Sequence, residues 1–266
     1  MSSNDHIRYF IELAYHGSSY HGWQIQLNAP SVQEVVDRTL STITRETVNT
    51  VGCGRTDTGV HARQLFAHFD LKKHILNIER FLHQVNSLLP ENIAARGIFE
   101  VPGEAHARFD ATKRSYEYHI HFDKNPFLTN LSWQVRTVPD VQKMNEAALV
   151  LLDYRDFSCF SKSNTQVFTN NCTVFEAYWQ LSQDESGFKR LIFSISADRF
   201  LRNMVRAIVG TLLEIGVDKQ PVEHIRKVIE SKNRSVAGAS VPANGLFLTK
   251  VEYEYSKTLL STNPKI

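Results

Sequence analysis

The feature that most constrains the fold is an order of strands and helices that occurs twice along the chain. In the first half, hydrophobic residues alternate from Ile7 to Tyr15, which predicts a strand. The sequence SVQE at residues 31–34 is a capping box, and the apolar stripe that follows it predicts a helix. The elements predicted for this half are strands over 7–15, 48–53, 65–71 and 93–101, and helices from 31 to about 43 and over 78–88.

The same order returns after residue 113. Strands are predicted near 116–122, 174–181, 188–197 and 246–253, with the turn DESG between the middle two, and helices near 141–152 and 201–215, the latter ended by Gly216. An extra helix is predicted over 221–231, with proline in its first turn. We therefore predict an α+β fold of two tandem ferredoxin-like β-α-β-β-α-β units, a layout shared with RNA-binding RRM modules. The units are predicted over 7–105 and 106–255, with a frayed tail over 256–266.

Composition argues against several classes of protein. The chain has 266 residues and 42% hydrophobic content, which is typical of a folded protein with a sizeable core. No run approaches the roughly 18 apolar residues of a membrane span, and the N-terminus lacks a targeting pattern, so we expect a cytoplasmic protein. Cys53, Cys159 and Cys172 lack C-x-x-C spacing, which argues against a disulfide framework and a zinc site. The sequence has no phosphate-cradling loop and no dinucleotide fingerprint, so we expect neither a metal nor a cofactor.

The stretch VGCGRTDTGVHA, residues 51–62, combines a carboxylate and a guanidinium with several glycines. The glycines permit tight turns and the close approach of a ligand, so Asp57 is expected on a connection between two strands, where folds often place chemistry. Arg55 is near enough to pair with Asp57 or to hold a phosphate, but one guanidinium cannot do both well. The alternative is a hairpin turn with a surface ion pair.

Local charge is more informative than the formal net charge of +2. Arg55 and Arg63 flank the loop, HARFDATKR contains Arg108, Lys113 and Arg114, and ADRFLRNMVR contains three more arginines. A fold that brings these three clusters together would form a basic groove for nucleic acid. The alternative for each cluster is a solvated face.

The loop and four further blocks resemble the tRNA pseudouridine synthase A family. GRTDTGVHA is similar to the family signature G-R-T-D-A-G-V-H-A. The blocks YHGSSYHGWQ with SVQE, HARFDATKRSYEY, FLRNMVRAIVGTLLEIG and ANGLFL follow in the family's order, so the resemblance runs from about residue 7 to residue 253. Several blocks in one order form a far more specific signal than a lone motif.

This resemblance implies the pseudouridine synthase fold and the isomerisation of uridine to pseudouridine at positions 38, 39 and 40 in the anticodon stem-loop of tRNA. The N1–C1′ bond breaks, the uracil turns, and C5 bonds to C1′. Such a reaction needs no group donor and no redox cofactor, and it asks for one ionised carboxylate where the sugar meets a base taken out of the stack. The resemblance also implies a homodimer with tRNA bound across both subunits.

Five site residues follow from the resemblance. Asp57 matches the family's essential aspartate, and Arg206 matches the arginine that pairs with it; apolar neighbours around Arg206 on its predicted helix also favour an anion beside it. Tyr116 matches the tyrosine that stacks on the target uracil, and Leu246 an apolar pocket residue. Arg55 matches the arginine that displaces or replaces the target base. The alternatives are that Arg206 is a helix-surface arginine, Tyr116 a core strand tyrosine and Leu246 a buried strand leucine.

Further contacts with RNA phosphates are expected from basic residues in the same blocks. The alternative for each of them is an ordinary solvated position. These candidates are His61, Arg63, Lys113, Arg114 and Arg202.

Two departures from the family pattern and three other interpretations bear on this assignment. Thr58 replaces the usual alanine, and FSKSNTQVFTNNCTV lacks an arginine-rich connection, which does not favour RNA contacts from that segment. A non-catalytic RNA-binding protein with tandem RRM-like units would be expected to have an RRM aromatic motif, which AHFDL and LIFSISA lack. A glycoside hydrolase would need a second acid near Asp57, for which Asp110 and Asp198 are the candidates. Cys53 is either a nucleophile beside a basic motif or, more in keeping with its position, a small buried residue at a strand end.

Overall fold

The computed structural model describes residues 6–162, 169–183 and 187–254. Within them the chain forms two compact units: the first contains the residues up to 112 and those from 248 onward, and the second contains residues 113–247. The predicted turn DESG, of which residues 184–186 are not described, and the predicted tail over 256–266 lie outside the described residues. No helix in the described part of the chain is long and apolar enough to cross a membrane.

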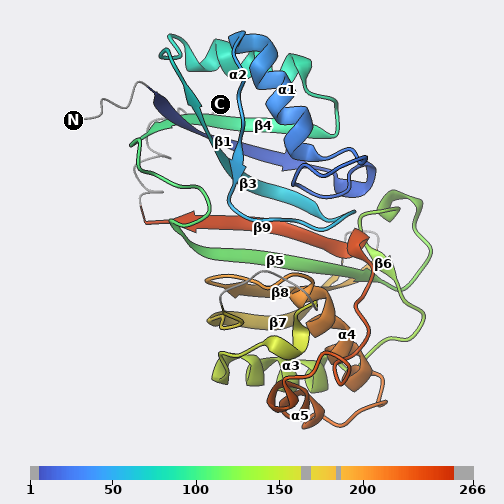
Figure 1. Cartoon of the computed structure of the whole chain (residues 1–266). Helices are drawn as coiled ribbons and strands as arrows, with labels where there is room; N and C mark the ends of the chain where they lie inside the picture. Colours follow the sequence, from blue (N-terminus) through green and yellow to red (C-terminus); the bar gives the residue numbers. More distant parts are fainter. Residues whose placement is uncertain (1–5, 163–168, 184–186, 255–266) are drawn as a thin grey trace. The chain divides into compact units, whose positions relative to one another are not determined.

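Three long antiparallel strands lie side by side in the sheet of the first unit (Figure 1). Their order is β4 (Ile93–Val101), β1 (Ile7–Tyr15) and β3 (His61–Leu71), and the short β2 (Val51–Gly52) pairs with β3. The alternating residues of β1 are buried on both faces, because Tyr9, Phe10 and Ile11 are each 0% exposed. The core of this unit therefore extends on both sides of its central strand.

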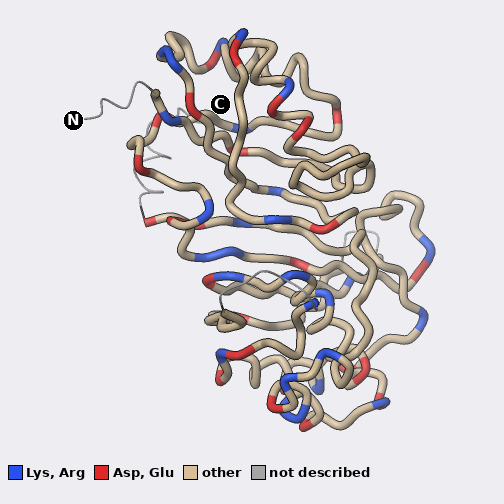
Figure 2. Tube along the Cα trace, viewed as in Figure 1, with Lys and Arg blue, Asp and Glu red and all other residues tan. Residues whose placement is uncertain are grey.

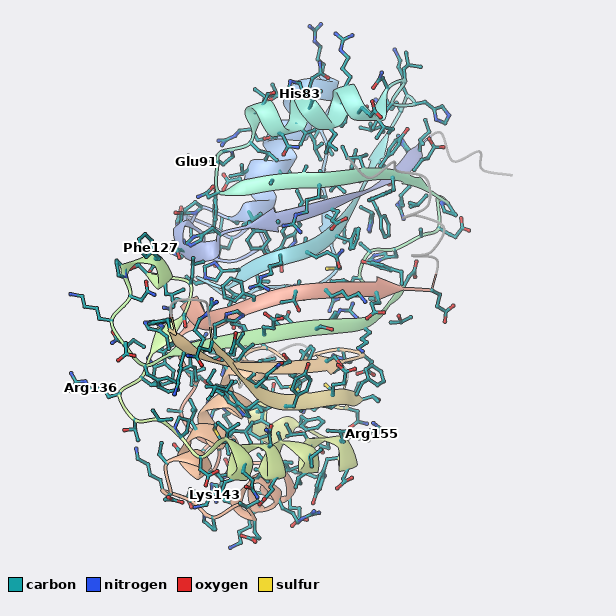
Figure 3. The ribbon with its side chains drawn as sticks, turned by 180° about the vertical axis from the view of Figure 1, so that it is seen from behind. His83, Glu91, Phe127, Arg136, Lys143 and Arg155 are labelled. Carbon is teal, nitrogen blue, oxygen red and sulfur yellow. The ribbon has the colours of Figure 1, made fainter. Side chains whose placement is uncertain are left out.

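Two capped helices, α1 (Val32–Thr44) and α2 (Ile78–Leu88), lie on the same side of these strands (Figures 1 and 3). The predicted capping box is present at its serine, since Ser31 Oγ accepts a hydrogen bond from the Glu34 N–H at 3.3 Å. Asn77 Oδ1 caps α2 in the same way, 2.8 Å from the Arg80 nitrogen. Side-chain caps at both N-termini fix where the two helices begin.

Aromatic rings gather around Phe10 on the central strand of this sheet. Phe10 contacts Phe66, His68 and Tyr253, with the Phe10 and Tyr253 ring centroids 5.5 Å apart. Tyr253 belongs to β9 (Leu246–Tyr253), and its hydroxyl donates to the Ala107 carbonyl at 2.7 Å. The end of the chain's last strand is thus part of the core of the first unit.

The second unit contains an antiparallel sheet with the order β5 (Ala111–His121), β8 (Lys189–Ala197) and β7 (Val174–Gln183). The two-residue strand β6 (Trp133–Gln134) pairs with β5 in parallel. β9 begins in this unit, where the Phe247 ring centroid lies 4.8 Å from that of His119 on β5. The first two residues of β5 are counted with the first unit.

Helices cover this sheet. Helix α3 (Val141–Leu149) packs against β7 and against α4 (Met204–Gly216), and α5 (His224–Ser231) packs against α4. Ten of the thirteen residues of α4 are buried, so this helix forms the centre of the unit. Short 3-10 turns complete the described elements at Gly17–Ser19, Pro126–Leu128, Val150–Asp153, Ser158–Phe160 and Ala243–Gly245.

The predicted second strand, 48–53, is reduced to Val51–Gly52 because side chains of α1 bind the backbone before it. Ser41 Oγ accepts from the Val48 N–H at 2.9 Å, and Asp37 Oδ1 accepts from the Thr50 N–H at 2.9 Å. These amides are therefore not used in a strand ladder. Burial raises the pKa of the Asp37 carboxyl, and the hydrogen bonds from Thr50 oppose that shift.

Other boundaries also differ from the prediction. The third strand begins at His61 rather than 65, and the predicted helix over 141–152 changes to a 3-10 turn at Val150. Helix α4 begins at Met204 rather than 201, because Asn203 has a left-handed backbone with φ of 68°. Gly216 is the last residue of that helix, and the extra helix begins at His224, not at Pro221.

The buried His68 predicts a dependence of stability on pH. Its side chain is 5% exposed, its Nδ1 accepts from the Ala107 N–H at 3.2 Å, and burial lowers its pKa to about 4, with the charge of Arg8 acting in the same direction. Because the unfolded chain binds a proton at the ordinary histidine pKa, the free energy of unfolding falls as pH drops from about 6.5 to about 4, by up to about 3 kcal/mol.

Chemical denaturation at several pH values tests this prediction. His68→Asn keeps an acceptor for the Ala107 amide but cannot titrate, so its free energy of unfolding should vary less with pH than that of the wild type over this window. His83→Asn is the matched control, because His83 is exposed on α2 (Figure 3). Equal pH dependence in His68→Asn and wild type would contradict the assignment.

Candidate functional site

The loop that contains Asp57 is a tight turn that ends where β3 begins. The Val60 N–H donates to the Asp57 carbonyl at 3.1 Å, and Gly59 turns the chain with φ of 79° and donates to the Tyr20 carbonyl at 3.3 Å. Asp57 is half-buried, whereas Arg55 is exposed. The carboxylate is thus presented from a fixed turn and not from a long surface loop.

Backbone contacts with the segment after β1 hold this turn in place. The Trp23 N–H donates to the Thr56 carbonyl at 3.3 Å, and the Thr56 and Tyr15 hydroxyls are 2.8 Å apart. Gly22 has φ of 92°, and a Cβ on it would lie 2.2 Å from the Thr56 carbonyl oxygen. A Cβ on Gly17 would similarly lie 2.0 Å from the Val60 carbonyl oxygen. Only glycine allows the two backbones to approach this closely on both sides of Asp57.

His61 and Arg63 follow on β3. His61 is 1% exposed, its Nδ1 accepts from the Gly17 N–H at 3.0 Å, and its ring centroid lies 4.6 Å from that of His16. Its Nδ1 therefore carries no proton in this arrangement, and the ring supports the turn from within the unit. Arg63 is exposed on the same strand.

In the second unit, Arg206 lies in the first turn of α4 and is half-buried. Its Nε donates to the Val241 carbonyl at 2.7 Å, and the Val241 N–H donates back to the Arg206 carbonyl at 3.2 Å. Since a guanidinium is planar, a hydrogen bond at Nε fixes the direction of its other N–H groups. Arg206 is therefore a positioned cation and not a mobile surface arginine.

The segment that orients Arg206 is itself packed tightly on α4. A Cβ on Gly210 would lie 1.9 Å from the Ala239 carbonyl oxygen, and the Gly238 N–H donates to Thr211 Oγ1 at 2.9 Å. At the start of the helix, Asn203 Nδ2 donates to Ser240 Oγ. Close backbone contacts at a glycine thus fix the segment that orients Arg206, as such contacts fix the turn that contains Asp57.

Tyr118 supports the same segment from β5. Its hydroxyl donates to the Pro242 carbonyl at 2.8 Å, and its side chain is 0% exposed. Burial raises the pKa of Tyr118 far above its usual value, and the nearby charge of Arg206 only partly opposes that shift. The phenol therefore stays protonated and serves as a fixed hydrogen-bond donor.

Tyr116, two residues earlier on β5, is half-buried and lies opposite Ile195 of β8. The ring of Phe200 meets it edge-on, with centroids 5.0 Å apart and an interplanar angle of 83°. Leu246, at the start of β9, is 6% exposed. The tyrosine is braced by an aromatic neighbour, whereas the leucine is a buried strand residue.

The remaining basic candidates of this unit already have partners among acidic or backbone groups. Arg114 donates to the Asp198 carbonyl at 2.6 Å, and Lys113 forms an ion pair with Glu176 at 3.3 Å. Arg202 is exposed before α4. Lys and Arg residues occur in both units rather than in one alone (Figure 2).

The residues named in the alternative interpretations, Cys53, Asp110 and Asp198, are buried or bind backbone amides. Cys53 is 1% exposed, which does not favour a nucleophile. Asp110 accepts from the His106 N–H at 2.7 Å, and Asp198 accepts from the backbone amides of Thr173 and Arg199, each at 2.7 Å. Asp110 lies in the first unit and Asp198 in the second. Among the described residues, no group of three or more His, Cys, Asp or Glu could hold a metal ion.

The structure therefore divides the predicted site residues between two units. Residues that sequence reasoning did not assign to the site are those that position it, namely Tyr15, Gly17, Gly22, Trp23, Tyr118 and Phe200. Closely spaced glycines in YHGSSYHGW are the one signal that points to some of them. The first unit contains Arg55, Asp57, His61 and Arg63, and the second contains Lys113, Arg114, Tyr116, Arg202, Arg206 and Leu246.

Comparisons with known proteins agree on one family. A family model described as tRNA pseudouridine synthase matches residues 147–254. A protein of Bacteroides fragilis named tRNA pseudouridine synthase A is 50% identical over 246 residues, which cover 92% of this chain and 96% of the relative. Its namesake in Bacteroides thetaiotaomicron is 48% identical over 262 residues, 96% of each chain. One from Clostridium acetobutylicum is 38% identical over 245 residues, 91% of this chain and 98% of the relative.

The glycine contacts around Asp57 predict a contrast between two substitutions. Gly22→Ala should lower the free energy of unfolding by about 1 to 3 kcal/mol, because alanine is strained at that positive φ and its Cβ meets the Thr56 carbonyl. Gly54→Ala is the matched control, since a Cβ there meets nothing within 4 Å, and its effect should stay within about 1 kcal/mol. Thermal or urea unfolding measures both. Equal stability of the two variants would contradict the role given to Gly22.

Proposed function

Because this chain belongs to the tRNA pseudouridine synthase A family, we propose that it isomerises uridine to pseudouridine in tRNA. The N1–C1′ bond breaks, the uracil turns, and C5 bonds to C1′; the hydrogen on C5 leaves as a proton, and N1 gains one. The product therefore has the same atomic composition as the substrate. The observation that carries the proposal is the half-buried Asp57 on a turn fixed from both sides by glycine contacts.

Asp57 is the catalytic carboxylate of this proposal. It acts at the junction of sugar and base, where the bond from C1′ to N1 is replaced by a bond from C1′ to C5. Fixed backbone contacts at Thr56 and Val60 support this role, because a reacting group must be held in place before the substrate arrives. A nucleotide taken out of its stack would bring the sugar to the carboxylate.

Arg206 is proposed as the cation that keeps Asp57 ionised and orients it when the base is bound. A carboxylate that loses water beneath an RNA needs such a partner, or its pKa rises. The hydrogen bond from Arg206 Nε to the Val241 carbonyl supports this role, because it aims the guanidinium before substrate binds. The tight packing of residues 238–241 on α4 supports it further.

Tyr116 is proposed to stack on the target uracil, with Leu246 as an apolar wall of the pocket. The edge-on contact with Phe200 supports this, since a braced ring loses little freedom when a base stacks on it. Arg55, which is exposed beside Asp57, would take the space of the displaced base or hold a phosphate.

The partner in this proposal is the anticodon stem-loop of tRNA, with targets at positions 38, 39 and 40, and the enzyme acts as a homodimer in the cytoplasm. Exposed Arg63 and Arg202 are the basic candidates best suited to phosphate contacts. Lys113 and Arg114 would contribute after exchanging or sharing their present partners. His61 contributes by supporting the turn, because it is 1% exposed.

The proposed architecture is the pseudouridine synthase fold, built from two ferredoxin-like units over residues 7–105 and 106–255. The strand order β4-β1-β3 with β2 on β3 supports this in the first half, and the order β5-β8-β7 supports it in the second.

Incubation of the purified protein with an unmodified tRNA transcript tests the function. Pseudouridine as the product supports the proposal. Free uracil would instead indicate hydrolysis of the glycosidic bond, and bound but unchanged tRNA would indicate a non-catalytic RNA-binding protein. Either of these two results would overturn it.

Asp57→Asn should abolish pseudouridine formation, with single-turnover rates at least about a thousandfold lower, while folding and tRNA binding persist. Asparagine keeps the size of the side chain and removes the negative charge, so affinity should stay equal or rise slightly. Single-turnover assays with enzyme in excess, run beside a binding assay, measure both. Asp153→Asn is the control, because Asp153 is exposed in the second unit. Substantial turnover by Asp57→Asn would remove the catalytic assignment.

Arg206→Lys should reduce turnover more than it reduces tRNA affinity. Lysine keeps the positive charge but has no planar fork and no Nε donor for the Val241 carbonyl. Comparison of kcat with the dissociation constant of tRNA separates the two effects, and a loss of about tenfold or more in kcat is expected. The matched control is Arg136→Lys, since Arg136 is exposed and points outward (Figure 3). Turnover equal to that of the control would leave Arg206 with a structural role only.

Affinity for tRNA should fall steeply with salt although the net charge is only +2. Several basic side chains release phosphate counterions together, so the dissociation constant should rise by about tenfold or more between roughly 50 and 200 mM salt. Filter binding or fluorescence anisotropy over a salt series gives the slope. A flat dependence would argue against phosphate contacts by several basic residues.

A further inference from the structure

The connection between β4 and β5 in the first unit forms a compact loop at residues 102–110 (Figure 1). Its side chains bind its own backbone. Asp110 Oδ2 accepts from the His106 N–H at 2.7 Å, and His106 Nδ1 accepts from the amides of Arg108 and Phe109 at 3.1 and 3.3 Å. The loop is therefore held in one conformation by its sequence.

Contacts with the core of the unit anchor the same loop. The Ala107 N–H donates to His68 Nδ1, and the Ala107 carbonyl accepts from the Tyr253 hydroxyl at 2.7 Å. Arg8 donates to the Ala105 carbonyl at 3.0 Å. Partners on β1, β3 and β9, of which His68 and Tyr253 are buried, thus fix the backbone on which the next two side chains stand.

Those two side chains are Arg108 and Phe109, and they face solvent. Phe109 is 74% exposed, although its backbone is among the well-anchored parts of the unit. Its ring centroid lies 4.2 Å from that of His106, and the guanidinium carbon of Arg108 lies 5.7 Å from it. Burial lowers the pKa of His106, and its ring packs against the phenyl ring.

A rigid exposed aromatic ring beside an arginine matches the chemistry by which proteins hold unpaired or terminal bases. The ring offers a face for a nucleobase, and the guanidinium stacks on bases or binds phosphate. A polyanionic, base-bearing partner uses both groups at once.

The position of the loop separates it from Asp57. The turn of Asp57 is anchored at His61, and the loop is anchored at His68, seven residues farther along β3 and thus about 23 Å away at the rise of a strand. An RNA held at both places would therefore meet Phe109 and Asp57 with different nucleotides.

We propose that Phe109, with Arg108 beside it, is a second RNA contact that stacks on a base several nucleotides from the target uridine. This inference rests on the proposed function for its choice of RNA as the partner. Phe109 and Arg108 strengthen tRNA binding and set how the RNA lies along the first unit.

The test compares the affinity of three variants for one unmodified tRNA transcript. Phe109→Ala should weaken binding about tenfold, whereas Phe109→Trp, which keeps a stacking ring, should bind within about twofold of the wild type. Phe127→Ala is the matched control, because Phe127 is 87% exposed in the second unit and points outward (Figure 3). It should also bind within about twofold of the wild type. Circular dichroism confirms that each variant is folded.

Three results would overturn the inference: an unchanged affinity of Phe109→Ala, an equal loss in Phe109→Ala and Phe127→Ala, or a loss in Phe109→Trp as large as in Phe109→Ala. Sedimentation measures the oligomeric state of each variant. If Phe109→Ala changes only the oligomeric state, the ring is a contact between copies of the chain and the inference is wrong. If the wild type makes pseudouridine and Phe109→Ala binds tRNA as tightly as the wild type, this inference fails and the proposed function stands. If Phe109→Ala loses tRNA affinity but the wild type makes no pseudouridine, the proposed function fails and this inference stands.

Discussion

The close approach of Gly22 to the Thr56 carbonyl is the contact on which the candidate site depends most. A Cβ at Gly22 would lie 2.2 Å from that oxygen, so the two backbones pack with no side chain between them. Gly17 makes the equivalent approach to the Val60 carbonyl on the other side of Asp57. Between these two points the backbone has little freedom, and Asp57 is presented from it while only half-buried.

The same physical device occurs in the second unit. Gly210 lets the Ala239 carbonyl approach the α4 backbone, and the segment after it supplies the Val241 carbonyl that orients Arg206. The Tyr118 hydroxyl binds the next carbonyl, that of Pro242. Each unit thus uses glycine to bring two backbones together and then presents one charged side chain from the result. A carboxylate on a fixed backbone and an oriented guanidinium are suited to a reaction that moves one bond without a cofactor.

Much of the fold could be predicted because its signals are local. The alternation over Ile7–Tyr15 and the predicted strand over Leu246–Tyr253 correspond to strands with those bounds. The short length of the second strand could not be predicted, since it comes from Ser41 and Asp37 side chains that bind amides seven and thirteen residues away. The start of α4 was misplaced for a different reason, a left-handed Asn203.

The site shows the same limit. Asp57 and Arg206 stand out in the sequence because their charges lie among glycines and among apolar residues, respectively. The residues that support the site do not stand out. Tyr118, which binds the Pro242 carbonyl, and Phe200, which contacts Tyr116, look like ordinary strand and loop aromatics and act through contacts between distant segments. The glycines of YHGSSYHGW are the exception, because close spacing of glycines already suggests backbone packing.

The central claim, that this chain makes pseudouridine in tRNA, is tested most directly by mapping pseudouridine by mass spectrometry in tRNA from cells that lack the protein. Uridine in place of pseudouridine at positions 38, 39 and 40, restored when the chain is supplied again, is the predicted result. An unchanged map in the absence of the protein would contradict the claim.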